Sequence, residues 1–112
     1  MAWREDYVTR QIRVIAAMIA RMAGLRLEGN AEQAHAELEQ AYGELLGERN
    51  KLVRMVDAST ASSLLGSAEK IRLFAQLVSE EAEQGADSGH AELLRARAAE
   101  LNAEAERRQQ TL

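Results

Sequence analysis

Hydrophobic positions in the first quarter of the chain recur every three or four residues. They are Val8, Ile12, Ile15, Ile19 and Met22. This period predicts an amphipathic helix over residues 4–27. Further apolar residues widen the stripe on one side: Tyr7, Val14, Met18 and Leu25. The apolar arc covers about half of the helix circumference, whereas a surface helix usually carries a stripe of roughly 100°. We therefore expect more than one neighbour to cover this helix.

Later segments carry narrower, alanine-rich stripes with the same period. They predict helices over residues 31–46, 68–84 and 89–107, and the residues between 48 and 66 predict two short helices joined by a turn. The inward positions of the three longer segments are Ala34, Leu38, Ala41 and Leu45; Ile71, Phe74, Ala75, Val78 and Ala82; and Ala91, Leu94, Ala98, Leu101 and Ala105. The predicted fold is all-α, with four to five antiparallel helices.

Glycines and capping residues mark the predicted helix ends. The glycines that follow helix-forming runs are Gly29, Gly47, Gly66 and Gly85, where left-handed C-caps are expected. Asn30 precedes Gln33 by the spacing of a capping box. Ser67 is the expected cap of the helix that begins at residue 68, and Asp87 or Ser88 that of the last helix.

Composition changes this picture by making the core thin. The chain has 112 residues, no proline and no cysteine, and much of its 46% apolar content is alanine. Alanine favours helix but contributes little burial energy, so we expect stability gained from neighbours, as in repeats or oligomers. We predict a single helical domain over residues 1–106 and a flexible tail over residues 107–112.

Charge and hydropathy exclude some classes of function. The net charge is −4; residues 1–28 carry +2 and the remainder −6. An acidic body argues against nonspecific nucleic-acid binding. The most apolar run covers seven residues, 14–20, and is too short for a bilayer, which needs about 20. With no basic–apolar leader pattern at its start, the chain is expected to be cytoplasmic, without a membrane or nucleic-acid partner.

Two helix–glycine–helix units resemble each other, over residues 18–46 and 74–101. In each unit a turn glycine, Gly29 or Gly85, precedes two alanines seven positions apart. These alanines are Ala34 and Ala41 in the first unit and Ala91 and Ala98 in the second. The pattern resembles the second helix of a tetratricopeptide repeat, and the resemblance implies antiparallel helix pairs packed closely through small side chains.

The pattern departs from that repeat at several positions. Met22 stands where the repeat has a small residue, Arg95 where it has a large apolar one, and the terminal proline is absent. About twenty residues separate the two units, so the chain resembles a divergent, non-contiguous pair of repeats rather than a solenoid.

The whole chain also resembles a family of small bacterial helical proteins that has no assigned function. The resemblance rests on residues 6–12, 29–47 and 74–82 and on Leu64-Leu65. It covers nearly the full length and implies the all-helical architecture and a bacterial origin, but no role.

Two candidate sites suggest chemistry other than protein binding. Glu32 and His35 have the Glu-x-x-His spacing of di-iron helical bundles, which leaves a metal-dependent helical enzyme as one alternative. The second alternative is a nucleic-acid-associated protein that uses the arginines of residues 4–26. We expect instead that His35 is solvated, that these arginines pair with the acidic helices, and that no metal or cofactor is bound.

The leading prediction is a non-catalytic, helical protein-interaction module, either self-associating into a homo-oligomer or binding another protein. Its first helix is the expected interface, because its apolar arc is too wide for a chain with few large residues. The residues predicted to make the contact are Trp3, Tyr7, Arg10, Met18 and Met22. Methionine suits an adaptable surface, and tryptophan is a common interface anchor. Trp3 equally suits a role as a cap on the end of the core.

Overall fold

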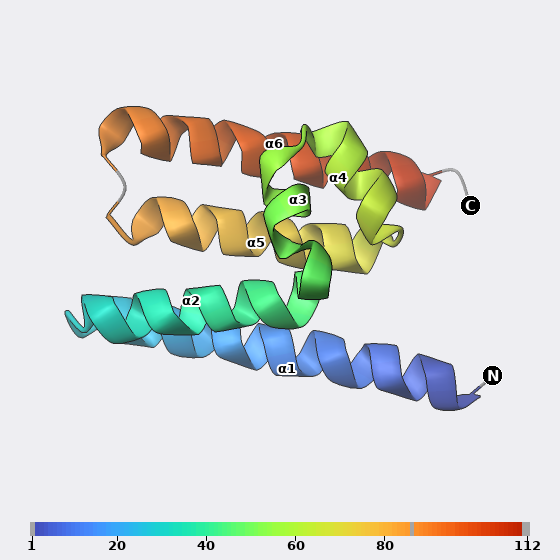
Figure 1. Ribbon diagram of the computed structural model, residues 1–112, viewed down its shortest axis with the longest axis horizontal. Coiled ribbons are helices and arrows are strands. Elements are labelled where there is room, and N and C mark those ends of the chain that lie inside the picture. Colours follow the sequence, from blue (N-terminus) through green and yellow to red (C-terminus); the bar gives the residue numbers. More distant parts are fainter. Residues whose placement is uncertain (1, 86, 111–112) are drawn as a thin grey trace.

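The fold consists of helices and turns throughout the part of the chain that the structure describes (Figure 1). The computed structural model describes residues 2–85 and 87–110, with side chains from residue 7 onward. The four long helices are α1 (Ala2–Leu27), α2 (Ala31–Leu46), α5 (Ala68–Glu83) and α6 (Ser88–Gln110). A turn of 3-10 helix (Gly47–Arg49), α3 (Asn50–Met55) and α4 (Ala58–Leu65) connect α2 to α5.

The long helices form two antiparallel pairs, α1 with α2 and α5 with α6. In Figure 1, α5 lies between α2 and α6, and α3 and α4 cross in front of the second pair. The most extensive contacts are those within the pairs, while both α1 and α2 also contact α5, and α4 packs on α6. The predicted all-α fold with antiparallel helices is confirmed.

Small residues are buried on the second helix of each pair. Ala34 and Ala41 of α2 are fully buried, and Ala91 and Ala98 of α6 are nearly so. Small side chains allow close approach of two helix backbones. Had these alanines faced solvent, the predicted nesting of the helix pairs would have been wrong; their burial is what the prediction requires.

The turn within each pair is closed by a glycine with a positive φ. Gly29 has φ +84° and Gly85 has φ +104°, a conformation that L side chains rarely adopt. The side chain of Ser67 accepts a hydrogen bond from the backbone N–H of Lys70, as predicted for the start of α5. Asn30 makes no side-chain capping hydrogen bond, so the capping box predicted there is wrong.

The core centres on α5, which has neighbours on most of its sides. Its buried residues include all five predicted inward positions and also Leu73, Leu77 and Glu80. Across the pairs, the rings of Tyr42 and Phe74 meet edge to face with centroids 6.1 Å apart, an arrangement that favours aromatic pairing.

Helix α6 continues through Gln110, so the end predicted near Arg107 lies too early. Arg108 donates a hydrogen bond to the hydroxyl of Ser63 on α4. The predicted mobility of residues 107–112 stays a prediction. Within the described ranges, α1 to α6 include no helix that is both long and apolar enough to span a bilayer.

Candidate functional site

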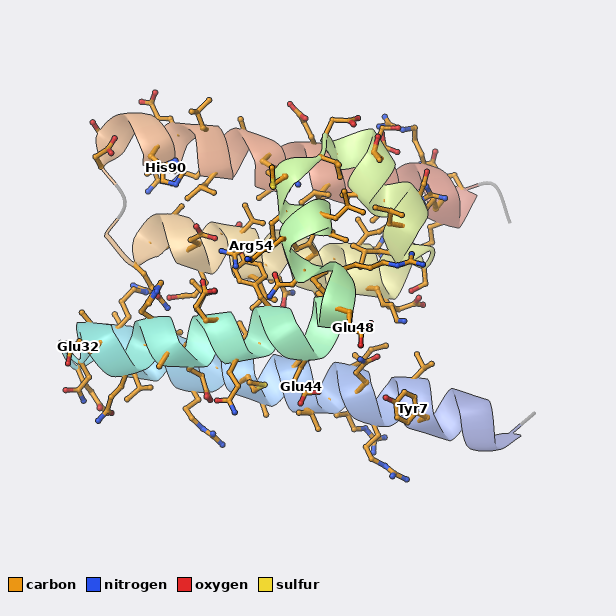
Figure 2. The ribbon with its side chains drawn as sticks, in the orientation of Figure 1. Tyr7, Glu32, Glu44, Glu48, Arg54 and His90 are labelled. Carbon is orange, nitrogen blue, oxygen red and sulfur yellow. The ribbon has the colours of Figure 1, made fainter. Side chains whose placement is uncertain are left out.

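A shallow groove runs along the surface between α1 and α2, and we call it the α1–α2 groove. It consists of two adjoining hollows of about 170 Å³ and 370 Å³. Its lining residues are Tyr7, Arg10, Gln11, Val14, Ala17, Met18 and Arg21 of α1 and Glu37, Gln40 and Glu44 of α2. Val14 and Glu44 belong to both hollows, so they mark the middle of the groove. Figure 2 shows Tyr7 and Glu44 on this side of the molecule.

Apolar side chains in the groove remain open to solvent. Tyr7 is 63% exposed and Val14 is 46% exposed. Both lie on the flank of α1 that widens its apolar stripe, while Ile15 and Met22 on the main stripe are fully buried. The expectation that several neighbours cover α1 therefore holds for the main stripe, since α1 contacts α2 and α5, and not for Tyr7 and Val14 on this flank.

Charged side chains along the groove are sorted by helix. Arg10 and Arg21 come from α1, and Glu37 and Glu44 come from α2. Arg21 pairs with Glu37 at 3.1 Å, although its side chain stays 67% exposed. Gln11 Nε2 donates a hydrogen bond to the backbone carbonyl of Glu44 at 2.9 Å, which ties α1 to α2 in the groove. The groove therefore has a basic wall and an acidic wall.

The structure distributes the predicted interaction residues between surface and core. Tyr7, Arg10 and Met18 line the α1–α2 groove, with Met18 nearly buried at its floor. Met22 is fully buried. It acts as a core residue, which differs from the contact role predicted for it. The side chain of Trp3 lies outside the described residues.

The arginines of the first helix differ in their partners. Arg26 Nε lies 2.7 Å from Glu80 of α5, and Arg21 pairs with α2, so pairing with the acidic helices is confirmed for these two. Arg10 and Arg13 have no ion-pair partner within residues 7–85 and 87–110. The hydrogen bond to the nearly buried Glu80 raises the pKa of Arg26 above its ordinary value.

The predicted metal ligands lie on the surface of α2. Glu32 and His35 are both exposed (Glu32 is labelled in Figure 2), whereas Glu39 is engaged by Arg54. Among the residues whose positions are described, no three His, Asp or Glu side chains come together in a way that would hold a metal ion.

A second cavity, of about 180 Å³, opens on another side of the molecule, where α2, α3, α5 and α6 meet. Its floor carries Phe74, Val78 and Leu94, and we call it the Arg97 cavity after the arginine at its edge. Two of its residues are labelled in Figure 2, His90 by α6 and Arg54 by α5, and both lie far from Tyr7 on α1.

A charged network forms one wall of the Arg97 cavity. Arg54 donates to both carboxylate oxygens of Glu39, at 3.0 Å and 3.2 Å, and lies 3.6 Å from Glu81. Its guanidinium carbon stands 4.0 Å from the centre of the Tyr42 ring, a cation–π contact. The Tyr42 hydroxyl in turn donates to Glu81 at 2.6 Å. This network ties α2, α3 and α5 together.

The network shifts the proton affinity of its members. Burial raises the pKa of Tyr42 well above its ordinary value, and the hydrogen bond to Glu81 adds to that rise. Burial alone would lower the pKa of Arg54, but the hydrogen bond to Glu39 and the nearby carboxylates reverse the direction and raise it. Tyr42 therefore stays neutral and Arg54 stays charged across the physiological range.

Sequence reasoning missed the Arg97 cavity and its network. The one available signal was Tyr42, which follows Leu38 by four positions and so belongs to the buried stripe of α2. A buried tyrosine hydroxyl needs a hydrogen-bond partner. Arg54 and Arg97 give no such signal, because their positions depend on how α3 and α6 pack.

Comparison of the chain with protein-family models, with curated proteins and with solved structures gives no match. The chain is a small all-helical domain, and its resemblance to tetratricopeptide repeats stays a prediction.

Proposed function

We propose that the chain is a non-catalytic protein-interaction module that binds a second copy of itself through the α1–α2 groove. The observation that carries this proposal is the open apolar flank of α1, in which Tyr7 and Val14 stay exposed between charged walls. Burial of apolar side chains like these is the main favourable contribution to association. The bacterial helical family that the sequence resembles has no assigned function, so the proposal depends on the groove.

Charge favours a second copy as the occupant. A homodimer with two-fold symmetry uses the same patch on both copies. A two-fold axis along the helices places α1 of one copy over α2 of the other at the same level. Arg10 then faces Glu44 of the partner subunit, and the reverse contact repeats it. Opposite charges at such positions fix the register and suppress wrong partners.

The thin core adds a second reason. Five of the twelve buried residues of α2 and α6 are alanine, and each contributes little burial energy. Covering Tyr7 and Val14 in a dimer adds apolar burial that the monomer lacks, and it links stability to association.

The test is the oligomeric state, measured by sedimentation velocity and by size-exclusion chromatography with light scattering. We expect the wild-type chain to dimerise reversibly and Val14→Glu to be monomeric at the same concentration, because a charge then enters the apolar strip. Leu93→Glu is the matched control, since Leu93 is 70% exposed on α6 and lies outside the groove. A wild-type chain that stays monomeric at high micromolar concentration contradicts the proposal.

A charge exchange tests the geometry of the dimer. Arg10→Glu and Glu44→Arg should each weaken self-association, because like charges then face each other twice. A mixture of the two variants should form heterodimers, since each pair of opposing charges is restored. Glu32→Arg, exposed on the same helix outside the groove, is the control and should rescue Arg10→Glu less, because one of the two facing pairs then remains like-charged. Equal rescue by both partners would rule out the proposed register.

A further inference from the structure

Arg97 differs from the other arginine of the Arg97 cavity in having spare hydrogen-bond donors. Its Nη2 donates to the backbone carbonyl of Val53 at 3.0 Å, and its guanidinium carbon lies 5.6 Å from the centre of the Phe74 ring. Within residues 7–85 and 87–110, no carboxylate pairs with it. A guanidinium has five N–H donors in a planar fork, so most of the donors of Arg97 remain for a ligand.

Arg54, by contrast, is already neutralised. Glu39 binds it with two hydrogen bonds and Glu81 lies within 4 Å. The charges of the two arginines and of Glu39 and Glu81 sum to zero, but both carboxylates lie close to Arg54. The Arg54 network carries one excess negative charge, and Arg97 carries one positive charge. A monoanion neutralises Arg97, whereas a dianion brings added negative charge close to Glu81.

The floor of the Arg97 cavity selects for an apolar ligand body. Phe74, Val78 and Leu94 are almost completely buried, and they line a space of about 180 Å³. This space suits a single aromatic ring or a short branched chain. An apolar pocket with a few placed polar groups is the usual form of a small-molecule site.

We propose that the Arg97 cavity binds a small monoanionic carboxylate whose apolar body is an aromatic ring or a branched alkyl group. Arg97 pairs with the carboxylate through two parallel N–H donors, and Phe74, Val78 and Leu94 contact the body. The cavity shares no lining residue with the α1–α2 groove, so this proposal is independent of self-association.

The test is an NMR titration of the intact chain with benzoate, with benzamide as the neutral probe of equal shape. We expect saturable shifts of the Val78 and Leu94 methyl resonances and of the Arg97 Nε–H resonance with benzoate, and much smaller shifts with benzamide. Resonances of Tyr7 and Val14 serve as an internal reference and should not move. No saturable shift with benzoate, or equal binding of benzamide, overturns the proposal.

Two variants on α6 locate the charge that binds. Arg97→Gln should weaken benzoate binding by about tenfold, the effect of losing about 1.4 kcal/mol of interaction. Arg95→Gln removes an exposed arginine two positions away, which pairs with Glu83, and should leave binding unchanged. Equal affinities for the two variants would contradict the role of Arg97.

Two further measurements cover the case in which Arg97→Gln does not fold and the case in which the ligand is not a monoanion. If Arg97→Gln proves unfolded by circular dichroism, Arg97→Lys replaces it; it keeps the charge but not the planar fork, and it should also weaken binding. Phenyl phosphate, largely a dianion at neutral pH, should bind more weakly than benzoate. Tighter binding of phenyl phosphate would overturn the assignment to a monoanionic carboxylate.

Discussion

The two helix pairs use the same means of packing but differ in what they leave uncovered. In both pairs a positive-φ glycine closes the turn, and two alanines seven positions apart are buried on the second helix. The α5–α6 pair exposes one large apolar side chain, Leu93, among its described residues. The α1–α2 pair exposes Tyr7, Val14 and Leu27, and the first two lie together in a groove.

This difference distinguishes apolar residues that the fold needs for its core from apolar residues that remain free to bind a partner. The buried positions of the α5–α6 pair form the core around α5. Helix α1 satisfies its own packing with Ile15, Met18 and Met22 and still carries apolar residues on a second flank. An apolar residue that the fold does not need is informative about binding, so α1 is the helix to test for an interface.

The largest effect is expected at the centre of the α5–α6 pair. Phe74→Ala removes a ring that is 1% exposed and should lower the free energy of unfolding by about 3–5 kcal/mol, a large share of the 5–15 kcal/mol typical of a domain. Urea denaturation followed by circular dichroism measures it. Leu93→Ala, on the exposed side of α6, should change stability by less than about 0.5 kcal/mol.

Overpacking the alanine positions tests whether the two pairs are equivalent. Ala41→Leu and Ala98→Leu should each cost about 1–3 kcal/mol, because a larger side chain separates two closely packed helices. Ala36→Leu and Ala99→Leu, at exposed positions of the same helices, are the controls and should be nearly neutral. A cost at only one of the two buried positions would show that only that pair depends on close approach. Urea denaturation also measures these changes.

The smallest effect compares two ion pairs of α1. Arg26→Ala leaves Glu80, whose side chain is 8% exposed, without its partner and should destabilise the fold by about 1–3 kcal/mol. Arg21→Ala breaks a pair whose arginine is mostly exposed and should cost about 1 kcal/mol or less. Thermal unfolding of both variants decides the order. If Arg21→Ala proved the more costly, the contact of α1 with α2 would outweigh its contact with α5.

Local signals in the sequence were enough to predict the helices. The stripe from Ala34 to Leu45 predicted residues 31–46, which are the bounds of α2, and the Ser67 cap marked the start of α5. These features depend on spacing and on short-range hydrogen bonds. The cap predicted at Asn30 was wrong, because its side chain makes no such bond in the turn.

The candidate sites were harder to predict, because they depend on contacts between distant helices. Tyr7, Arg10 and Met18 were predicted from the width of one stripe, and the structure places them in one groove. Met22 belongs to the same stripe but points into the core. A stripe alone does not show which flank a neighbour will cover. The Arg97 cavity brings together residues from four helices, and no periodicity in the sequence relates them.

Tight turns at Gly29 and Gly85 keep the strongest helix contacts between neighbours along the chain. A topology of this kind favours fast folding, because short loops close quickly and with little loss of entropy. Each hairpin of helices can form early, and the docking of α1 and α2 on α5 remains as the step that joins distant parts of the chain. Helical proteins rich in local contacts of this kind fold within microseconds to milliseconds.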